Sequence, residues 1–558
     1  MNLFTRRATA LTALTAALIA ATTLTTGAQR ATKSVPADPD EKTIVHVLNR
    51  LGFGPTPGQV DRVREIGLET YINQQLTPER IPDAGIAERL AAFTTLRLAP
   101  REVAERYYLP AAAERRTTQR ASNAAMAAGA TGTDMTPGQK PAQSGPPGMQ
   151  GPQVVMAELT QQKLLRAAYS ERQLDELMVD FWFNHFNVFA GKGPVRIYTG
   201  AFERDTIRPH ALGNFRELLG AVAGSPAMLF YLDNWQSTAP EGAETSMNVP
   251  RRRAGQPGRP AMPNRPAAQN RSRGINENYA RELMELHTLG VSGGYSQKDV
   301  QEIARAFTGW TIAMPRQGGD FRFDPRMHDN GEKTVLGVTI PRGGGQKDGE
   351  RVLDILANHP STAKFIATKL ARRFVADEPP QALVDRAAAR FLQTDGNIRE
   401  VVRTIVTSPE FFAPGAYRAK VKTPFEFVAS AVRAAGVEIR NGQPLIQAMR
   451  EMGMPLYMCQ PPTGYADKAE AWVNTGALLS RMNFAVMLSG DRLLRGGPGT
   501  RRTVEEIKLA NRRVTQAQIA EQVLAGDLSD NTRLTIARAT TEPQKIALLL
   551  GSPDFQKR

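Results

Sequence analysis

Residues 172–189 read RQLDELMVDFWFNHFNVF, and this stretch decides what kind of protein the chain encodes. Its apolar residues recur every three to four positions, so in a helix they share one broad surface. The polar residues on the other side form a narrow strip: Glu176, Asp180, Asn184 and Asn187. A helix with so little polar surface must be largely buried, which requires neighbouring elements on most of its sides. The stretch therefore predicts a large multi-helix body.

The rest of the chain favours a mainly α fold. Its 558 residues are 41% hydrophobic and 22% charged, which supports a buried core and excludes a wholly disordered or collagen-like chain. Apolar residues at helical spacing predict further helices at 154–170, 202–223, 276–290, 296–309, 361–375, 380–394, 398–408, 424–435 and 470–488. One small β-hairpin is expected near 321–340, because two short strand-like runs flank Asp329-Asn330-Gly331, a turn signal.

Two long low-complexity loops interrupt the helical pattern, at about 121–153 and about 236–274. Neither has apolar periodicity, so both are interpreted as flexible insertions. Helices on either side of an insertion can still pack together, and no repeat of fixed period is found. We therefore expect residues 29–558 to form a single helical region.

The first 28 residues are typical of an export signal. Arg6 and Arg7 precede an alanine-rich apolar run and the small residues before position 29, so residues 1–28 are interpreted as a signal peptide cleaved after Ala28. A membrane anchor is the alternative, but an anchor needs roughly 20 strongly apolar residues, and the many threonines argue against it. Sec and twin-arginine export both remain open. The mature protein is expected to be periplasmic or extracellular.

Much of the net charge of +15 lies in one loop. Residues 245–273 contain seven arginines and no acidic residue. This arginine loop is suited to docking on an anionic envelope polymer or on lipid headgroups. A solvated, disordered insertion is the alternative interpretation. Because the chain is expected to be exported, nucleic acid is not expected as a partner.

His185 is the first candidate for chemistry, since it falls on the apolar surface of the opening stretch. Burial favours its neutral form, and both ring nitrogens then need hydrogen-bond partners. Two interpretations stay open: a core histidine with satisfied partners, and a catalytic base or ligand. The adjacent Asn184 is a candidate for substrate binding.

The predicted helix at 276–290 carries the densest set of ionisable residues. Glu277 and Arg281 lie one turn apart, either as part of a salt-bridged outer surface or as part of a functional cluster. Glu282 lies on the polar side next to Asn278, and the same two interpretations apply. Glu277, Arg281 and Glu282 are therefore catalytic candidates, and Asn278 is a candidate for substrate binding.

Two further pairs complete the candidate set. His46 and Arg50 lie one turn apart on a short helix near the start of the mature chain. His328 and Lys333 flank the expected hairpin turn, a common place both for function and for plain solvent exposure. His46 and His328 join the catalytic candidates, and Arg50 and Lys333 join the substrate-binding ones.

No metal site is expected, and any cofactor is unknown. The single cysteine, Cys459, excludes an internal disulfide and a cysteine-built zinc or iron–sulfur site. The sequence has no phosphate loop, dinucleotide fingerprint, HExxH pair, calcium loop or G-x-S-x-G elbow. The distances along the chain from Glu282 and Glu285 to His287 do not fit the Glu-x-x-His pattern of helical di-metal sites.

Together these motifs resemble the bacterial domain-of-unknown-function 1800 family over nearly all of the mature chain. The strings that carry the resemblance are HVLNRLGFGP (46–55), FWFNHF (181–186), NENYARELMELHTLG (276–290), GYS (294–296), AFTGW (306–310), HD (328–329), HP (359–360), SPEF (408–411) and PTGY (462–465). Phe307 and Tyr465 stand where relatives often carry Leu and Trp. The resemblance implies export and frequent genomic pairing with the domain-of-unknown-function 1501 family, which is similar to sulfatases and phosphatases. It implies no activity.

Two functions of different kinds fit these observations. The first is an extracytoplasmic enzyme in which the candidate residues gather in one cleft for general acid/base attack on a polysaccharide or other envelope polymer. The second is a non-catalytic envelope scaffold, or a maturation partner of a sulfatase- or phosphatase-like protein of the domain-of-unknown-function 1501 family. In that case the polar residues form a structural network that fixes helix packing.

Overall fold

The structure is a computed structural model, and it describes residues 35–127, 151–245, 274–439, 441–490 and 514–558. Helices dominate these ranges, and their only sheets are two small two-stranded ones. The predicted mainly α class and multi-helix body are confirmed.

The helices follow one another with short connections over most of the described chain. The α-helices are α2 (Glu41–Arg50), α3 (Gln59–Ile66), α4 (Leu68–Gln75), α5 (Ala84–Arg89), α6 (Pro100–Val103), α7 (Leu109–Ala127), α8 (Pro152–Tyr169), α9 (Gln173–His185), α10 (Val195–Ala201), α11 (Phe215–Ala223), α12 (Pro226–Tyr231), α13 (Glu277–Glu285), α14 (Gln297–Ala306), α15 (Lys347–Ala357), α16 (Pro360–Phe374), α17 (Gln381–Gln393), α18 (Ile398–Val406), α19 (Pro424–Ala435), α20 (Gln443–Glu451), α21 (Thr475–Ser489), α23 (Gln516–Leu524), α24 (Asp530–Ala537), α25 (Glu542–Gly551) and α26 (Pro553–Gln556). Shorter 3-10 and π turns lie between them: η1 (Pro78–Arg80), η2 (Thr94–Arg97), η3 (Ala104–Tyr108), η4 (Phe202–Ile207), η5 (Arg208–His210), η6 (Asn234–Gln236), η7 (Pro414–Ala416) and η8 (Ala469–Ala471).

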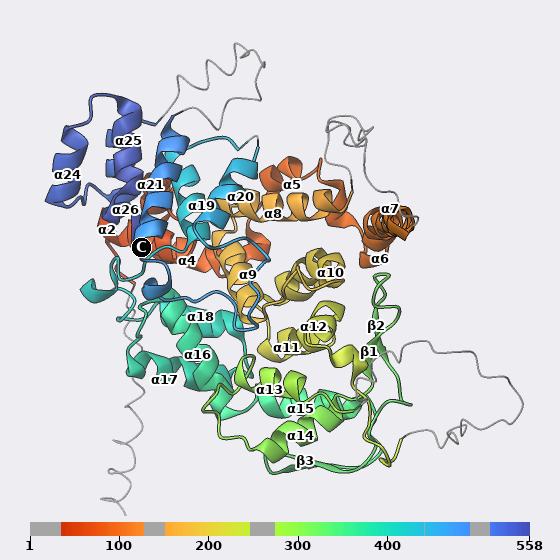
Figure 1. Cartoon of the computed structure of the whole chain (residues 1–558). Coiled ribbons are helices and arrows are strands. Elements are labelled where there is room, and N and C mark those ends of the chain that lie inside the picture. The colour runs from red at the N-terminus through yellow and green to blue at the C-terminus, as the bar shows by residue number, and fades with distance from the viewer. Residues whose placement is uncertain (1–34, 128–150, 246–273, 440, 491–513) are drawn as a thin grey trace, which may run out of the picture.

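Helix α9 lies near the middle of the body (Figure 1) and packs against α4, α8 and η4. Ten of its 13 residues are buried, as the sequence predicts. Among them, Trp182 donates a hydrogen bond of 2.9 Å from its indole nitrogen to the carbonyl of Ala211. The helix is shorter than predicted, because Phe186 leaves the helical conformation and its N–H closes the last turn on Trp182. This places His185 at the carboxyl end of α9.

The β-structure comprises β1 (Trp310–Ile312), β2 (Phe321–Phe323), β3 (Lys333–Val335) and β4 (Val338–Ile340). Strands β3 and β4 form a hairpin within the region where one is expected. Its turn is at Leu336-Gly337, where both φ angles are positive, as a tight hairpin turn requires. The prediction that Asp329-Asn330-Gly331 forms this turn is wrong. Strand β2 pairs antiparallel with β1 instead, a strand that the sequence pattern did not indicate.

Segments far apart in the chain pack together. Helices α2 and α3 contact α23, and α8 contacts α19 and α20, so N-terminal and C-terminal helices lie side by side (Figure 1). Backbone hydrogen bonds between Lys420 and Arg558 join the end of the chain to the segment before α19. The connection between α20 and α21, residues 454–468, lies against α9 and α16.

Residues at the ends of both expected insertions belong to the folded body instead. Residues 121–127 continue α7, and Pro152 already begins α8. Ser237 is buried, and Ala239 donates a backbone hydrogen bond of 2.7 Å to Met327. The remainder of both insertions and the expected signal peptide lie outside the described residues. Within the described ranges, no helix has both the length and the apolar character that a bilayer span needs.

Candidate active site

The imidazole of His185 is held by two partners from different segments. Its Nε2 lies 3.1 Å from the carbonyl oxygen of His287, and its Nδ1 lies 2.8 Å from Nζ of Lys369 on α16. A carbonyl oxygen only accepts, so Nε2 carries the proton and Nδ1 accepts a hydrogen bond from Lys369. Burial, and then the charge of Lys369, lowers the pKa of His185 well below its ordinary range. His185 is therefore a neutral imidazole that positions Lys369.

Lys369 has the properties of a general base. Burial lowers the pKa of its ammonium group to about 8; Asp467 opposes this shift and Arg372 adds to it. Near pH 8 about half of such amines are uncharged. One N–H of the amine then donates to His185, while the nitrogen lone pair remains available for a proton. Lysines with lowered pKa values beside a cavity are typical of base catalysis.

His185 and Lys369 line a partly open cavity of about 250 Å³ between α9, α16 and residues 454–468, which we name the Lys369 cavity. Its charged lining residues are Asp180, Lys369, Arg372, Arg373, Asp467 and Lys468. Its other polar lining residues are Asn184, His185, Thr423, Thr463 and Tyr465. The cavity thus combines one candidate base with several groups that can bind or orient a polar ligand.

Asn184 positions one wall of the Lys369 cavity. Its amide donates a hydrogen bond of 2.8 Å to the carbonyl of Tyr465 and accepts one of 2.7 Å from the Tyr465 N–H. The neighbouring Gly464 has φ +72°, and a Cβ there would lie 2.2 Å from the Asn184 carbonyl oxygen. Only glycine fits this approach. Because the Asn184 amide already bonds to Tyr465, it acts first as the clamp that holds residues 463–468 against α9.

His46 and Arg50, on α2, do not line the Lys369 cavity. Nε2 of His46 donates a hydrogen bond of 2.9 Å to the carbonyl of Phe411, and burial lowers the pKa of the imidazole to about 3. Arg50 is fully buried and donates one of 2.6 Å to the carbonyl of Ala416. These bonds tie α2 to residues 411–416.

Arg50 belongs to a group of buried cations behind one wall of the Lys369 cavity, which we name the buried cation cluster. Its members are Arg50, Arg373, Lys420, Lys422, Arg481 and Arg558. Glu426 links two of them, since its Oε1 lies 2.9 Å from Arg373 and 3.0 Å from Arg558. Arg373 also lines the cavity, so the cluster and the cavity share a residue.

His328 and Lys333 are brought together, but inside the protein. Nε2 of His328 and Nζ of Lys333 both bond to Oδ2 of Asp348, at 3.1 Å and 2.7 Å. The ammonium of Lys333 also donates to the carbonyls of Asp329 and Gly331, which uses all three of its protons. His328 and Lys333 are at most 1% exposed. They form a sealed structural network rather than an exposed hairpin tip.

Helix α13 places the remaining candidates at or near the surface. Glu277 accepts a hydrogen bond of 2.7 Å from Gln297, and Arg281 donates one of 2.9 Å to the same side chain. Asn278 is exposed. Glu282 is half-buried, and burial, with a smaller effect of Glu285, raises the pKa of its carboxyl.

The expected single cleft is thus not formed: of the ten candidates, only Asn184 and His185 line the Lys369 cavity. No group of three or more histidine, cysteine, aspartate or glutamate side chains in the described ranges is arranged to hold a metal ion.

The chain as a whole was compared with known proteins. The model of one family, described as "Protein of unknown function (DUF1800)", matches residues 46–557, which is nearly the whole chain. The chain belongs to the DUF1800 family. No curated protein and no solved structure matches it.

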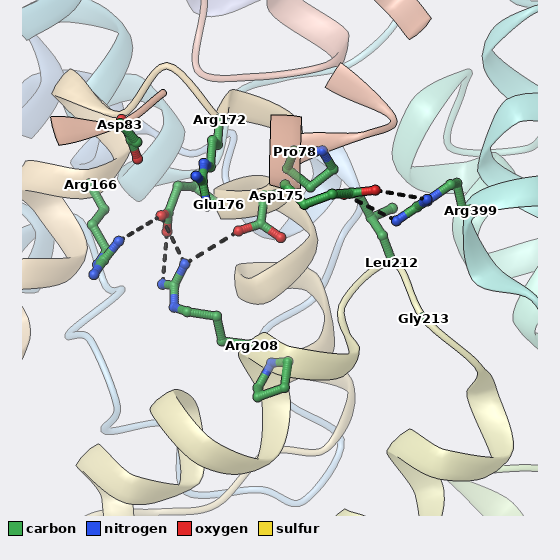
Figure 2. Close-up of a pocket in the computed structure, with 12 residues that line it drawn as sticks. Pro78, Asp83, Arg166, Arg172, Asp175, Glu176, Arg208, Leu212, Gly213 and Arg399 are labelled. Atoms are coloured by element: carbon green, nitrogen blue, oxygen red, sulfur yellow. Dashed lines mark hydrogen bonds and ion pairs between the residues drawn. The ribbon is translucent and has the colours of Figure 1, made fainter. Parts of the chain in front are cut away.

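This DUF1800 protein has a second cavity, of about 430 Å³, at the amino end of α9 (Figure 2). Glu176 accepts two hydrogen bonds of 2.8 Å from Arg208 and one of 3.2 Å from Arg166. The adjacent Asp175 lies 3.5 Å from Arg208. Burial, and then the charge of Glu176, raises the pKa of Asp175 to about 6. We name this the Asp175 cavity.

Sequence reasoning missed two groups beside these cavities whose pKa values are shifted, Lys369 and Asp175. Lys369 lies in α16, close to the bounds of 361–375 that the sequence predicts, but one lysine among several gives no local signal of its surroundings. The helical pattern of α9 assigns Asp175 neither to the apolar surface nor to the polar strip, so Asp175 does not stand out as a candidate. The available signal was the sequence RQLDE itself, which puts two adjacent carboxylates at the start of a buried helix.

Proposed function

We propose that this DUF1800 protein is an extracytoplasmic enzyme that performs general acid/base chemistry on an envelope polysaccharide in the Lys369 cavity. One observation carries the proposal: Lys369, with its pKa lowered to about 8, is hydrogen-bonded at 2.8 Å to a neutral imidazole and lines a partly open cavity. Its extracytoplasmic location rests on residues 1–28, which are typical of an export signal.

The chemistry assigned to the cavity needs one residue to move the proton. The neutral amine of Lys369 takes a proton from the substrate, or from a water that attacks it, and becomes an ammonium ion. The ammonium ion then gives this proton to the oxygen that leaves when the glycosidic bond breaks. His185 holds the amine in place throughout and stays neutral, because its own pKa lies far below that of Lys369.

The size of the cavity supports a small group as the reacting part of the substrate. Pockets for drug-sized ligands occupy roughly 300–1,000 Å³, so about 250 Å³ suits a single sugar unit. The partly open side leaves room for a polymer to continue into solvent.

The test compares purified mature protein with Lys369→Met and with the control Lys364→Met, which alters an exposed lysine on the same helix. The proteins are incubated with a panel of envelope polysaccharides, and new reducing ends and unsaturated products are measured. Lys369→Met should remove turnover while keeping the melting temperature of the control. Equal turnover in Lys369→Met and Lys364→Met would overturn the proposal.

A scaffold or maturation partner is the second candidate, because His46, His328 and Lys333 bond to buried internal groups. Its partner would be a sulfatase- or phosphatase-like protein of the domain-of-unknown-function 1501 family, or anionic polymer or lipid bound by the arginine loop at 245–273. Deletion of that loop should then abolish co-purification or vesicle binding and leave any turnover unchanged. Binding that survives the deletion would contradict this second candidate.

A further inference from the structure

The Lys369 cavity carries a surplus of positive charge. Its lining contains two aspartates, and one of them, Asp180, is already paired at 2.9 Å with Lys163 on α8. The other, Asp467, is 3.2 Å from Lys420 and 3.7 Å from Arg373. Arg372 and Lys369 also line the cavity, and neither forms an ion pair with one of these two aspartates.

The buried cation cluster increases this surplus. Glu426 is the central carboxylate, and it is shared by Arg373 and Arg558. Arg50 and Arg481 instead each donate a single hydrogen bond, to the carbonyls of Ala416 and Lys422. A guanidinium group keeps its charge at any pH a protein meets, so these residues cannot reduce the surplus by losing a proton.

Arg373 connects the cluster to the cavity and is itself incompletely bonded. It is 5% exposed, and its Nε and Nη2 atoms have no hydrogen-bond partner among the described residues. The Nη2 atom is close to Glu426 but is not aligned for a hydrogen bond with it. A buried charged donor without a well-aligned hydrogen bond destabilises the folded protein, so a nearby anion would be favourable.

We propose that the Lys369 cavity binds an oxyanionic group of the substrate, a carboxylate or a sulfate, through Arg372, and that the positive charge of Arg373 in the cavity wall adds to the attraction. This inference rests on the proposed function and names its substrate class: polysaccharides built from acidic sugars. Planar guanidinium groups match the paired oxygens of such anions. The anion would offset the charge surplus and would lie in the same cavity as the amine of Lys369.

Binding can be measured without turnover. Isothermal titration and thermal-shift assays would use sodium glucuronate as the carboxylate, inorganic sulfate as the sulfate, and sodium chloride at matched ionic strength as the reference. At least one oxyanion should bind and raise the melting temperature more than chloride does. The two arms distinguish uronic-acid polymers from sulfated ones.

Arg372→Gln is the decisive variant, because Arg372 is only half-buried and its loss spares the cluster. It should weaken binding of the oxyanion about tenfold or more, as expected for a hydrogen bond to a charged group. The control Arg386→Gln removes an exposed arginine on α17 and should bind like the wild type.

Absence of binding by both anions, or equal affinity in Arg372→Gln and Arg386→Gln, would overturn the inference. This result is separate from failure of the proposed function. A protein that binds glucuronate but shows no Lys369-dependent turnover retains the anion site and loses the catalytic role. A protein with Lys369-dependent turnover on a neutral polymer and no anion binding retains the catalytic role alone.

Discussion

Replacing Asp175 by asparagine should stabilise the protein, and mainly at higher pH. Asp175 lies in the Asp175 cavity, where burial and the neighbouring Glu176 oppose its negative charge more strongly than Arg208 favours it. Its pKa rises from 3.8 to about 6. Ionised Asp175 therefore destabilises the folded state, whereas asparagine keeps a similar shape without the charge.

The size of the effect follows from the pKa. A difference of about two pKa units between the unfolded and folded states corresponds to about 3 kcal/mol. Well below pH 3.8 the carboxyl is protonated in both states, so the wild type loses nothing there. The loss grows as the pH rises from 3.8 to about 6, because the unfolded chain ionises there while the folded protein keeps its proton, and it is complete above about pH 6.

Urea denaturation followed by circular dichroism would test this at about pH 4 and about pH 8. Asp175→Asn should exceed the free energy of unfolding of the wild type by less than about 1 kcal/mol at the lower pH and by about 3 kcal/mol at the higher pH. The control Asp385→Asn alters an exposed carboxylate on α17 and should show no such pH dependence. A variant that is less stable than the wild type at about pH 8, or a difference that does not change with pH, would refute the reasoning.

Three further substitutions test the packing around the Lys369 cavity and the sealed network. The attraction of Arg373 and Arg558 outweighs burial and holds the pKa of Glu426 at about 2. Glu426→Gln should therefore lower the free energy of unfolding by about 3 kcal/mol at neutral pH. This difference should shrink as the pH falls below about 4.5. An unchanged urea midpoint at neutral pH would contradict this. Gly464→Ala should lower the melting temperature and impair turnover, because its Cβ meets Asn184; normal values for both would show that the clamp is unnecessary. His328→Ala should lower the free energy of unfolding in urea by about 3 kcal/mol, because it removes a buried member of the network with Asp348. The affinity for glucuronate should stay unchanged. A loss of affinity without a loss of stability would instead assign His328 a functional role.

The fold was predictable where local pattern decides it. The narrow polar strip of α9 predicts its burial, and ten of its 13 residues are buried. The sequence predicts the hairpin turn at Asp329-Asn330-Gly331 because these residue types favour turns. In the structure this segment lies before the hairpin and contacts other side chains. There, Asp329 pairs with Arg305 and Gly331 helps to hold Lys333.

The candidate site was predictable only in part, because its partners are distant in sequence. The pattern identified His185 and its burial, but the decisive contact reaches Lys369, 184 residues away. Likewise, Asn184 bonds to Tyr465 across 281 residues. Periodicity describes one helix at a time, so it cannot show which helix faces which. It therefore placed Glu282 and His328 in a cleft that the structure does not form.

The titration of Lys369 tests the central claim most directly. Amine-specific acylation at a series of pH values, with mass spectrometry of the peptides, gives the reactivity of Lys369 and of the exposed Lys364 from the same helix in one experiment. Lys369 should become reactive with a midpoint near pH 8, well below that of an ordinary lysine at about 10.4, and bound oxyanion should protect it. A Lys369 that follows the same pH dependence as Lys364, or that never reacts, would contradict the account.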